Sequence, residues 1–265
     1  MMVHDFDPIF VDFGILQIRW YSMAYIFGIL IGWWYGKILL KKQTLGANTI
    51  IYLKNFDDLI GYLILGIIVG GRLGYVVFYD PSFYISNFLE IFKLWNGGMS
   101  FHGGLIGVII TTYIFSNLKN LNYKIYFDTL SCAAPIGIFL GRLSNFLNSE
   151  LYGIPTEKPW AVIFPKIDNL TRHPSQIYEA LLEGLVLFFI LNFFIRKRNL
   201  GYGFVSSLFL ILYGIFRIIS EQFRAPDEHL GYIFQSLSMG SLLSISMIVF
   251  GLVFLLKINF NEKNR

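Results

Sequence analysis

Long apolar runs alternate with short polar segments along most of the chain. Each run is close to the length that crosses a bilayer as a helix, which takes about 20 residues. We predict seven such spans: Trp20–Leu40, Leu59–Phe78, Ser100–Phe115, Ile125–Phe146, Ile177–Ile195, Phe204–Ser220 and Leu237–Leu256. The pattern indicates an all-α polytopic membrane protein in which residues 1–265 form a single integral membrane domain.

One longer polar segment interrupts this pattern between the fourth and fifth runs. Residues 147–175 are too polar to span a membrane and contain four prolines, at positions 155, 159, 165 and 174. We expect a small extramembrane cap there. Proline is tolerated in a first helical turn, so His173-Pro174-Ser175 predicts the start of the fifth helix.

The basic residues between the runs predict the orientation of the chain. One side would carry Lys37, Lys41, Lys42, Lys54, Lys119, Lys124, Arg196, Lys197, Arg198, Lys257, Lys263 and Arg265. The other side would carry Arg19, Lys93, Lys158, Lys166, Arg172 and Arg224. The first set is twice as large and should be cytoplasmic. The N-terminus and the cap would then lie outside, and the C-terminus would be cytoplasmic.

Composition agrees with a membrane protein and limits the other classes. Hydrophobic residues make up 55% of the chain and charged residues only 14%, against about 25% in soluble domains. The net charge of +4 could suggest nucleic acid, but the basic residues fall in short loops, so we expect no nucleic-acid partner. The single cysteine, Cys132, excludes a disulfide within the chain. The acidic N-terminal segment differs from a secretory signal, and we expect no cleavable signal.

Glycines recur at every fourth position in the first two spans. They are Gly28, Gly32 and Gly36 in the first run and Gly66, Gly70 and Gly74 in the second. This spacing lets two helix backbones approach closely, so we predict tight helix packing along these faces.

Three arginines, Arg72, Arg142 and Arg217, lie inside apolar runs, where a charged group is costly unless it is partnered or used. They fall near the outer ends of the second, fourth and sixth spans. The topology brings Tyr21 and His102 to the same level. Guanidinium groups bind phosphate oxygens in a two-pronged manner, so we interpret this level as a site for phospholipid headgroups. Alternatively, each arginine could snorkel to headgroups or pair with Glu150, Glu183 or Glu221.

Two of these polar groups leave a choice between function and structure. His102 follows a glycine-rich segment and could accept a proton from a nucleophile, or it could be an interfacial histidine bonded to a carbonyl. Glu221 follows Arg217 at the fourth position, so the two can pair along one helix face. That pair could be structural, or it could hold the guanidinium for a ligand.

These residues resemble the prolipoprotein diacylglyceryl transferase family over almost the whole chain. The resemblance is carried by Arg19-Trp20-Tyr21, Gly97-Gly98-Met99-Ser100-Phe101-His102-Gly103-Gly104, Gly141–Gly153, Arg172-His173-Pro174-Ser175-Gln176 and Tyr213–Asp227. The family motif Gly-Arg-x-Gly-Asn-Phe-x-Asn-x-Glu-x-x-Gly has Ser144 at its second glycine here. Serine is small, so we expect the turn there to survive. The cap is short for the family.

The resemblance implies a reaction and its participants. Phosphatidylglycerol would donate its diacylglyceryl group to the lipobox cysteine thiol of a prolipoprotein signal peptide, with release of glycerol phosphate. This is the first step of bacterial lipoprotein maturation, and it would take place at the outer leaflet of the cytoplasmic (inner) membrane. No cofactor and no metal are expected. The family's functional positions correspond to Tyr21, His102, Arg142, Asn145, Gly153, Arg217 and Glu221.

From the residues we assign roles as hypotheses. Arg142 and Arg217 would bind the phosphate and stabilise charge on the leaving group, and His102 is the candidate base. Asn145 and Tyr21 would orient headgroup oxygens, and the resemblance adds Gly153 and Glu221 to the phosphatidylglycerol site.

Three other functions remain open at this stage. An anion transporter would place polar groups at several depths, and a lipid-binding scaffold would tolerate changes at His102 and Asn145. An intramembrane protease would need a serine motif such as Gly-x-Ser-x-Gly or two aspartates within spans, and only Asp128, at a helix start, comes near this.

Overall fold

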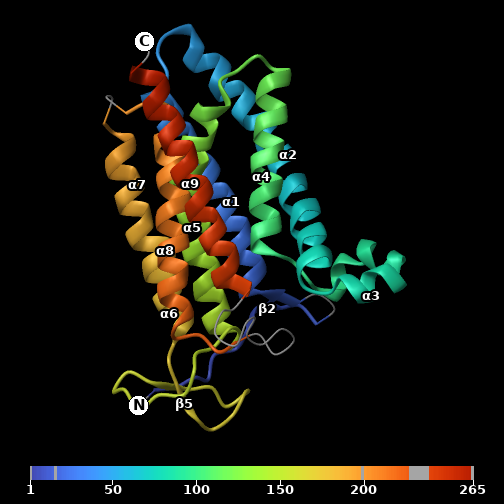
Figure 1. Ribbon diagram of the computed structural model, residues 1–265. Coiled ribbons are helices and arrows are strands. Elements are labelled where there is room, and N and C mark those ends of the chain that lie inside the picture. Colours follow the sequence, from blue (N-terminus) through green and yellow to red (C-terminus); the bar gives the residue numbers. More distant parts are fainter. Residues whose placement is uncertain (1, 15–16, 198–199, 227–238, 264–265) are drawn as a thin grey trace. The chain divides into compact units, whose positions relative to one another are not determined.

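The computed structural model describes residues 2–14, 17–197, 200–226 and 239–263 (Figure 1). The chain divides into two compact units, one made of Met1–Gly36 with Asp128–Arg265 and the other of Lys37–Phe127. Arg198, Asp227, Leu237 and Arg265, which the sequence predictions mention, lie outside the described residues.

All seven predicted spans are confirmed as helices long and apolar enough to cross a membrane. They are α1 (Trp20–Gln43), α2 (Ala47–Phe78), α4 (Phe101–Leu118), α5 (Tyr123–Leu147), the continuous α6–η3–α7 helix (Ser175–Ile195), α8 (Phe204–Glu221) and α9 (Met239–Lys263). The fifth helix starts at Ser175, directly after Pro174, as expected.

The prediction that Lys54 lies in a loop is wrong, because α2 begins at Ala47. The polar segment before the second run is helical and has a buried face made of Tyr52, Phe56 and Leu59. These positions are four and three residues apart, which places them on one side of a helix. The Tyr126 hydroxyl donates to the Tyr52 carbonyl at 3.0 Å and holds this end of α2.

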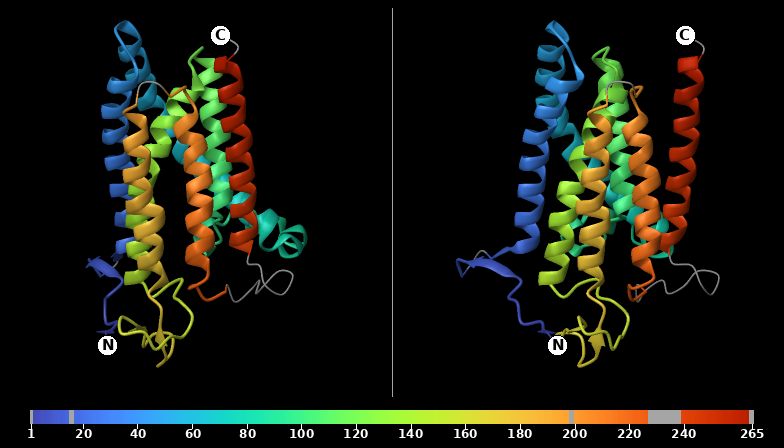
Figure 2. Two further views of the ribbon diagram at one scale, coloured as in Figure 1. Left: turned by 60° about the vertical axis from the view of Figure 1, so that its left-hand side comes forward. Right: turned by 90° about the vertical axis from the view of Figure 1, so that its left-hand side faces the viewer.

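In the larger unit, α1, α5, α6–η3–α7, α8 and α9 run side by side (Figure 2). Small residues allow the close contacts. A Cβ on Gly28 would lie 3.1 Å from the Cα of Gly137, and a Cβ on Gly214 would lie 2.8 Å from the Ser244 carbonyl. The predicted close packing along the glycine face of α1 is therefore confirmed at Gly28, where α1 approaches α5.

Three very short strands lie at one end of this unit, in and beside the predicted cap of residues 147–175. The strand order is β1 (Met2–Val3), β4 (Val162–Ile163) and β5 (Thr171–Arg172), and β1 pairs with β4 in parallel. A separate antiparallel pair joins β2 (Ile9–Asp12) to β3 (Gln17–Arg19). The N-terminal segment therefore completes the cap, a long-range pairing that the sequence pattern did not predict.

His4 follows β1 and lies in the interior of this cap. Its ring packs against Phe6, Phe146 and Phe164 at centroid distances of 5.1, 5.0 and 5.2 Å. Its Nδ1 lies 3.1 Å from the Ser149 hydroxyl. His4 is only 1% exposed, so burial lowers the pKa of its imidazole below the ordinary 6.5.

The smaller unit is organised around the contact between α2 and α4. A Cβ on Gly70 would lie 2.4 Å from the Gly103 carbonyl, and one on Gly74 would lie 2.6 Å from the Gly103 Cα. The predicted close approach along the second glycine series is confirmed. The segment between these helices forms α3 (Pro81–Ser86), η1 (Phe88–Phe92) and η2 (Leu94–Asn96).

Candidate active site

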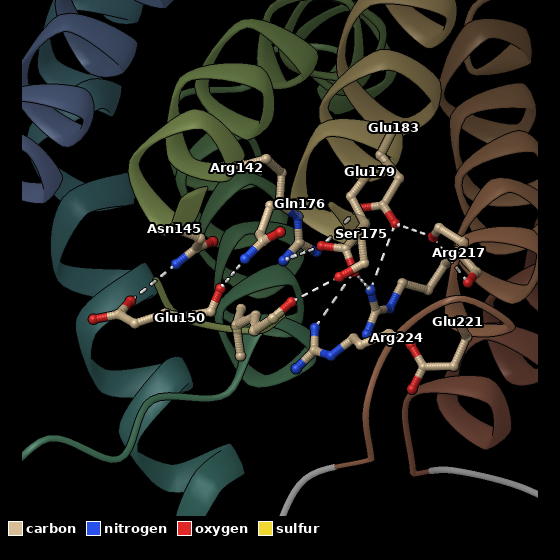
Figure 3. A network of polar contacts seen from close by, with 12 residues as sticks. Arg142, Asn145, Glu150, Ser175, Gln176, Glu179, Glu183, Arg217, Glu221 and Arg224 are labelled. Atoms are coloured by element: carbon tan, nitrogen blue, oxygen red, sulfur yellow. Dashed lines mark hydrogen bonds and ion pairs between the residues drawn. The ribbon is translucent and has the colours of Figure 1, made fainter. Parts of the chain in front are cut away.

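Arg142 on α5 and Arg217 on α8 meet at one carboxylate, that of Glu179 on α6. The Arg142 Nη1 lies 2.8 Å from Glu179 Oε2, and the Arg217 Nη1 lies 2.7 Å from Glu179 Oε1. Figure 3 shows both guanidinium groups turned toward this carboxylate from different helices. The prediction that these two arginines come together is confirmed, and each takes the ion-pair form considered above.

A second carboxylate, Glu183, lies one helical turn further along the same helix. Its Oε2 accepts from the Arg142 Nη2 at 3.0 Å, and its Oε1 accepts from the Ser220 hydroxyl at 3.0 Å. Both glutamates are 0% exposed, whereas Arg142 and Arg217 side chains keep 15% and 8% of their surface. The carboxylates are thus the inner layer of the site, and the arginines lie over them.

Two more charged side chains complete this group. The Arg217 Nη2 lies 2.5 Å from Glu221 Oε2, the fourth-position pair that the sequence predicted. The Arg224 Nη1 lies 3.6 Å from Glu179 Oε1. We call Arg142, Glu179, Glu183, Arg217, Glu221 and Arg224 the arginine–glutamate cluster.

Local helix geometry explains how the two glutamates enter the cluster together. Residues Ala180–Val186 (η3) form a π-helical turn between α6 and α7. Such wide turns are rare and occur often at functional sites. Gly184 allows the η3 turn to pack closely against α5, because a Cβ at this position would lie 2.7 Å from the Phe139 Cβ.

The end of α5 positions the residues that follow Arg142. The amide of Glu150 donates to the Asn145 carbonyl at 2.9 Å, and the amide of Ser149 donates to the Phe146 carbonyl at 3.0 Å. Ser149 has a φ of 59°, so these two hydrogen bonds form the left-handed helix ending usually made by glycine. The left-handed residue at this helix end is therefore a serine, which carries no glycine signal.

The expectation of a turn at Ser144 is wrong, because α5 continues through this position to Leu147. The Ser144 hydroxyl donates to the Trp20 carbonyl at 3.3 Å, so it links α5 to the start of α1. Tyr21, the next residue, lies at this end of α1, and its hydroxyl is 3.1 Å from that of Tyr25. The proposed role of Tyr21 with a headgroup stays a prediction.

The helix ending also places Asn145 beside Glu150. The Asn145 amide donates to Glu150 Oε2 at 3.1 Å (Figure 3). The Gln176 side chain donates to the Glu150 carbonyl at 2.7 Å, and the Ser175 hydroxyl donates to the Leu151 carbonyl at 2.9 Å. The first turn of α6 is thereby joined to the segment after α5, which holds Asn145 close to the cluster.

Gly153 lies where three backbone segments meet. Its amide donates to the His173 carbonyl at 3.1 Å, and it forms an isolated bridge with Arg224. A Cβ at this position would lie 2.3 Å from the His173 carbonyl oxygen and 2.6 Å from that of Phe223. The glycine is needed for this backbone packing, which fixes the base of Arg224, and its contact with a substrate stays a prediction.

Arg172 and its neighbours support this region from the cap. Arg172 donates to the Gly153 carbonyl at 3.0 Å and pairs with Asp168 at 2.5 Å. The hydrogen bonds from Arg172 hold the pKa of the Asp168 carboxyl below its usual range. Burial lowers the pKa of the His173 imidazole, and nearby Lys158 adds to that effect. His173 is therefore neutral near pH 7, with Nδ1 3.0 Å from the Tyr178 hydroxyl.

His102 belongs to the smaller unit and is the second residue of α4. Ser100 caps that helix, since its hydroxyl accepts from the Gly103 amide at 3.2 Å. The Ser100 amide in turn donates to the Gly71 carbonyl at 2.9 Å, which ties the start of α4 to α2. The His102 side chain is 8% exposed. Its role as a base at the level of the arginines stays a prediction.

Arg72, the third arginine of the predicted set, serves the connection between α2 and α4. Its guanidinium lies 5.1 Å from the ring centre of Tyr84. It donates to five backbone carbonyls, those of Glu90 (2.6 Å), Ile91 (2.9 Å), Lys93 (3.2 Å), Gly97 and Gly98 (3.1 Å). Arg72 therefore ties down residues 88–98, and this use of its donors differs from that of Arg142 and Arg217.

The sequence predictions omitted two members of the cluster, Glu179 and Arg224, and treated Glu183 only as a possible partner. A signal for the glutamates was present. Two acidic residues four positions apart in an apolar helix lie on one face and need cationic partners. Arg224 follows the end of α8, where an interfacial arginine would be unremarkable.

Comparisons with known proteins show the family of the chain. The family model described as "Prolipoprotein diacylglyceryl transferase" matches residues 8–257. A phosphatidylglycerol–prolipoprotein diacylglyceryl transferase of Rickettsia bellii (strain OSU 85-389) is 48% identical over 259 residues, which cover 97% of each chain. The protein of the same name from Methylocella silvestris is 48% identical over 251 residues, covering 93% of this chain and 91% of the relative.

A Wolbachia pipientis protein with the same name is 47% identical over 259 residues, which cover 96% of each chain. The range matched by the family model, residues 8–257, contains all six positions of the arginine–glutamate cluster. The chain belongs to the prolipoprotein diacylglyceryl transferase family.

Proposed function

We propose that the chain transfers the diacylglyceryl group of phosphatidylglycerol to the lipobox cysteine of prolipoproteins. The cysteine sulfur would form a bond to the glycerol carbon that carries the phosphate. The carbon–oxygen bond to that phosphate would break, and glycerol phosphate would leave. The relatives' names and the family membership support this reaction over the transporter, scaffold and protease alternatives.

The observation that carries the proposal is the pairing of Arg142 and Arg217 on one buried carboxylate, at 2.8 and 2.7 Å. A guanidinium has five N–H donors, and the ion pairs of Arg142 with two glutamates and of Arg217 with three leave others for a ligand. Fixed cations aimed at the phosphate would stabilise the charge that develops as it leaves, because they need no rearrangement during the reaction.

The attacking group would be the thiolate of the peptide cysteine. A free thiol has a pKa near 8.5, and nearby guanidinium groups favour its ionised form. We propose His102 as the base that receives the thiol proton. Tyr21 and Asn145 would orient headgroup oxygens, and Gly153 and Glu221 would complete the phosphatidylglycerol site.

The test is a transfer reaction with purified components. The protein, phosphatidylglycerol and a peptide with a free lipobox cysteine would be combined, and the peptide mass followed. We expect a gain of one diacylglyceryl group and release of glycerol phosphate. A peptide whose mass stays unchanged with folded protein would reject the proposal. A full rate for His102→Gln would remove only the base assignment.

We also propose that this chemistry takes place at the outer leaflet of a bacterial cytoplasmic membrane. The support is the twofold excess of basic residues in the segments assigned to the cytoplasmic side. Single cysteines at Lys166 in the cap and at Lys119 after α4 would test this in a Cys132→Ser background. In intact spheroplasts, a membrane-impermeant maleimide should label the first and spare the second, and the reverse result would invert the topology.

A further inference from the structure

The arginine–glutamate cluster is formally neutral. It contains three arginines, Arg142, Arg217 and Arg224, and three glutamates, Glu179, Glu183 and Glu221. A site that only had to attract anions would leave its arginines without carboxylates. Here an anionic headgroup would add negative charge to a balanced group, so the carboxylates need a reason.

Glu179 is the centre of this balance. One oxygen lies 2.8 Å from Arg142, and the other lies 2.7 Å from Arg217 and 3.6 Å from Arg224. Its side chain is completely buried, so it lies beneath the guanidinium groups rather than at the exposed face. Glu183 also contacts Arg142 and Arg217, but its distance to Arg217 is 3.7 Å.

We propose that Glu179 is a positioning residue with two effects on the transfer, an inference that rests on the proposed function. It fixes the spacing of Arg142 and Arg217, so that both can reach one phosphate. It also offsets their charge, so that the released glycerol phosphate can leave.

The second effect follows from the charges of substrate and product. The phosphodiester of phosphatidylglycerol carries one negative charge, whereas a phosphate monoester carries between 1.5 and 2 near pH 7, roughly as a phosphorylated side chain does. Attraction to an uncompensated group of arginines would therefore favour the product over the substrate. A neutral cluster holds the phosphate by directed hydrogen bonds and reduces this preference.

Replacing the Glu179 carboxylate by an amide separates this role from a general structural one. Glu179→Gln keeps the size of the side chain and leaves the cluster with a formal charge of +1. We expect glycerol phosphate to inhibit this variant about tenfold more strongly, because one unit of charge is added a few ångströms from the phosphate. We expect kcat to fall by about tenfold or more while KM for phosphatidylglycerol falls or stays equal.

Glu179→Asp is the matched variant that keeps the charge and withdraws the carboxylate by one methylene. We expect it to lower kcat, since it can no longer span both arginines, while inhibition by glycerol phosphate stays within about twofold of the original. Glu90→Gln is the control at a carboxylate outside the cluster, where Glu90 pairs with Lys93 at 2.5 Å. It removes one carboxylate charge away from the cluster and should leave inhibition by glycerol phosphate unchanged.

The measurements are initial rates in mixed micelles with glycerol phosphate added, on protein whose thermal transition in detergent is intact. Unchanged or weaker product inhibition in Glu179→Gln would overturn the charge role. If Glu179→Gln does not accumulate, Glu179→Asp tests the positioning role. A kcat of Glu179→Asp equal to that of the unmutated protein would overturn that role. If the unmutated protein were inactive, the proposed function itself would be rejected instead.

Discussion

Replacing Arg142 tests whether its two-pronged contact, rather than its charge alone, maintains the site. Arg142 spans two buried carboxylates, at 2.8 Å from Glu179 and 3.0 Å from Glu183. Lysine keeps the charge but has a single ammonium group, which cannot reproduce the fork of a guanidinium. Arg142→Lys should therefore lose one charge-assisted hydrogen bond, worth about 1.5–3 kcal/mol.

The loss should be visible in both stability and rate. For a protein of this length, about 2 kcal/mol corresponds to a fall of roughly 4–8 °C in the thermal midpoint. Arg142→Gln should cost more, about 3–5 kcal/mol, because it leaves two fully buried carboxylates with one cation fewer. On the transfer reaction, loss of a charge-stabilising donor typically lowers kcat by about 10²–10³.

The assay combines thermal unfolding in detergent with the rate of transfer to a lipobox peptide. Arg19→Lys is the matched control, since Arg19 is exposed on β3 and such a change should stay within about 0.5 kcal/mol. If Arg142→Lys had the same thermal midpoint and the same kcat as the unmutated protein, the two-pronged contact would contribute nothing measurable. That result would refute the role given to Arg142.

Three further outcomes follow from other parts of the structure. Asp128 accepts from the amides of Gly203 at 2.7 Å and Ser206 at 2.8 Å, so Asp128→Asn, which loses one acceptor, should lower the unfolding free energy by about 0.5–2 kcal/mol. An unchanged thermal midpoint would contradict this. Arg72→Gln should speed amide hydrogen exchange in residues 88–98 and leave the middle of α2 unchanged, because Arg72 binds five carbonyls of that segment. Equal protection in the two proteins would show that the carbonyl contacts do not order it. Because the pKa of His4 is lowered in the folded chain, His4 binds more protons in the unfolded chain than in the folded one. The contribution of His4 to stability is therefore complete above about pH 6.5 and decreases as the pH falls. His4→Phe should make the thermal midpoint less dependent on pH between about pH 7 and pH 5. An equal pH dependence in both proteins would mean that other groups cause it.

The membrane fold could be predicted because its signals are local. A run of apolar residues long enough to cross a bilayer has few alternatives to a helix, since backbone groups in lipid must bond internally. The same topology brought Arg142 and Arg217 to one level. The structure confirmed the seven helices and the meeting of these arginines.

The features that the sequence did not predict depend on contacts between distant segments or on how each helix is rotated about its axis. The pairing of β1 with β4 joins two-residue strands from distant parts of the chain, and no periodicity can appear in two residues. The left-handed ending of α5 falls on Ser149, where the usual glycine is missing. Glu179 could be recognised as costly in an apolar helix, but its choice of Arg142 and Arg217 depends on how three helices are rotated.

The level at which the two arginines meet follows from an equal spacing on two parallel helices. On α5, Arg142 follows Asp128 by fourteen residues, and Arg217 on α8 follows Gly203, the N-cap of that helix, by fourteen residues as well. At about 1.5 Å per residue both intervals measure roughly 21 Å. Asp128 bonds the Gly203 amide at 2.7 Å, so α5 and α8 are aligned at that end by a buried carboxylate. Equal lengths then place Arg142 and Arg217 at the same height, where Glu179 joins them. The alignment of Arg142 with Arg217 is thus set in part by a contact about 20 Å away.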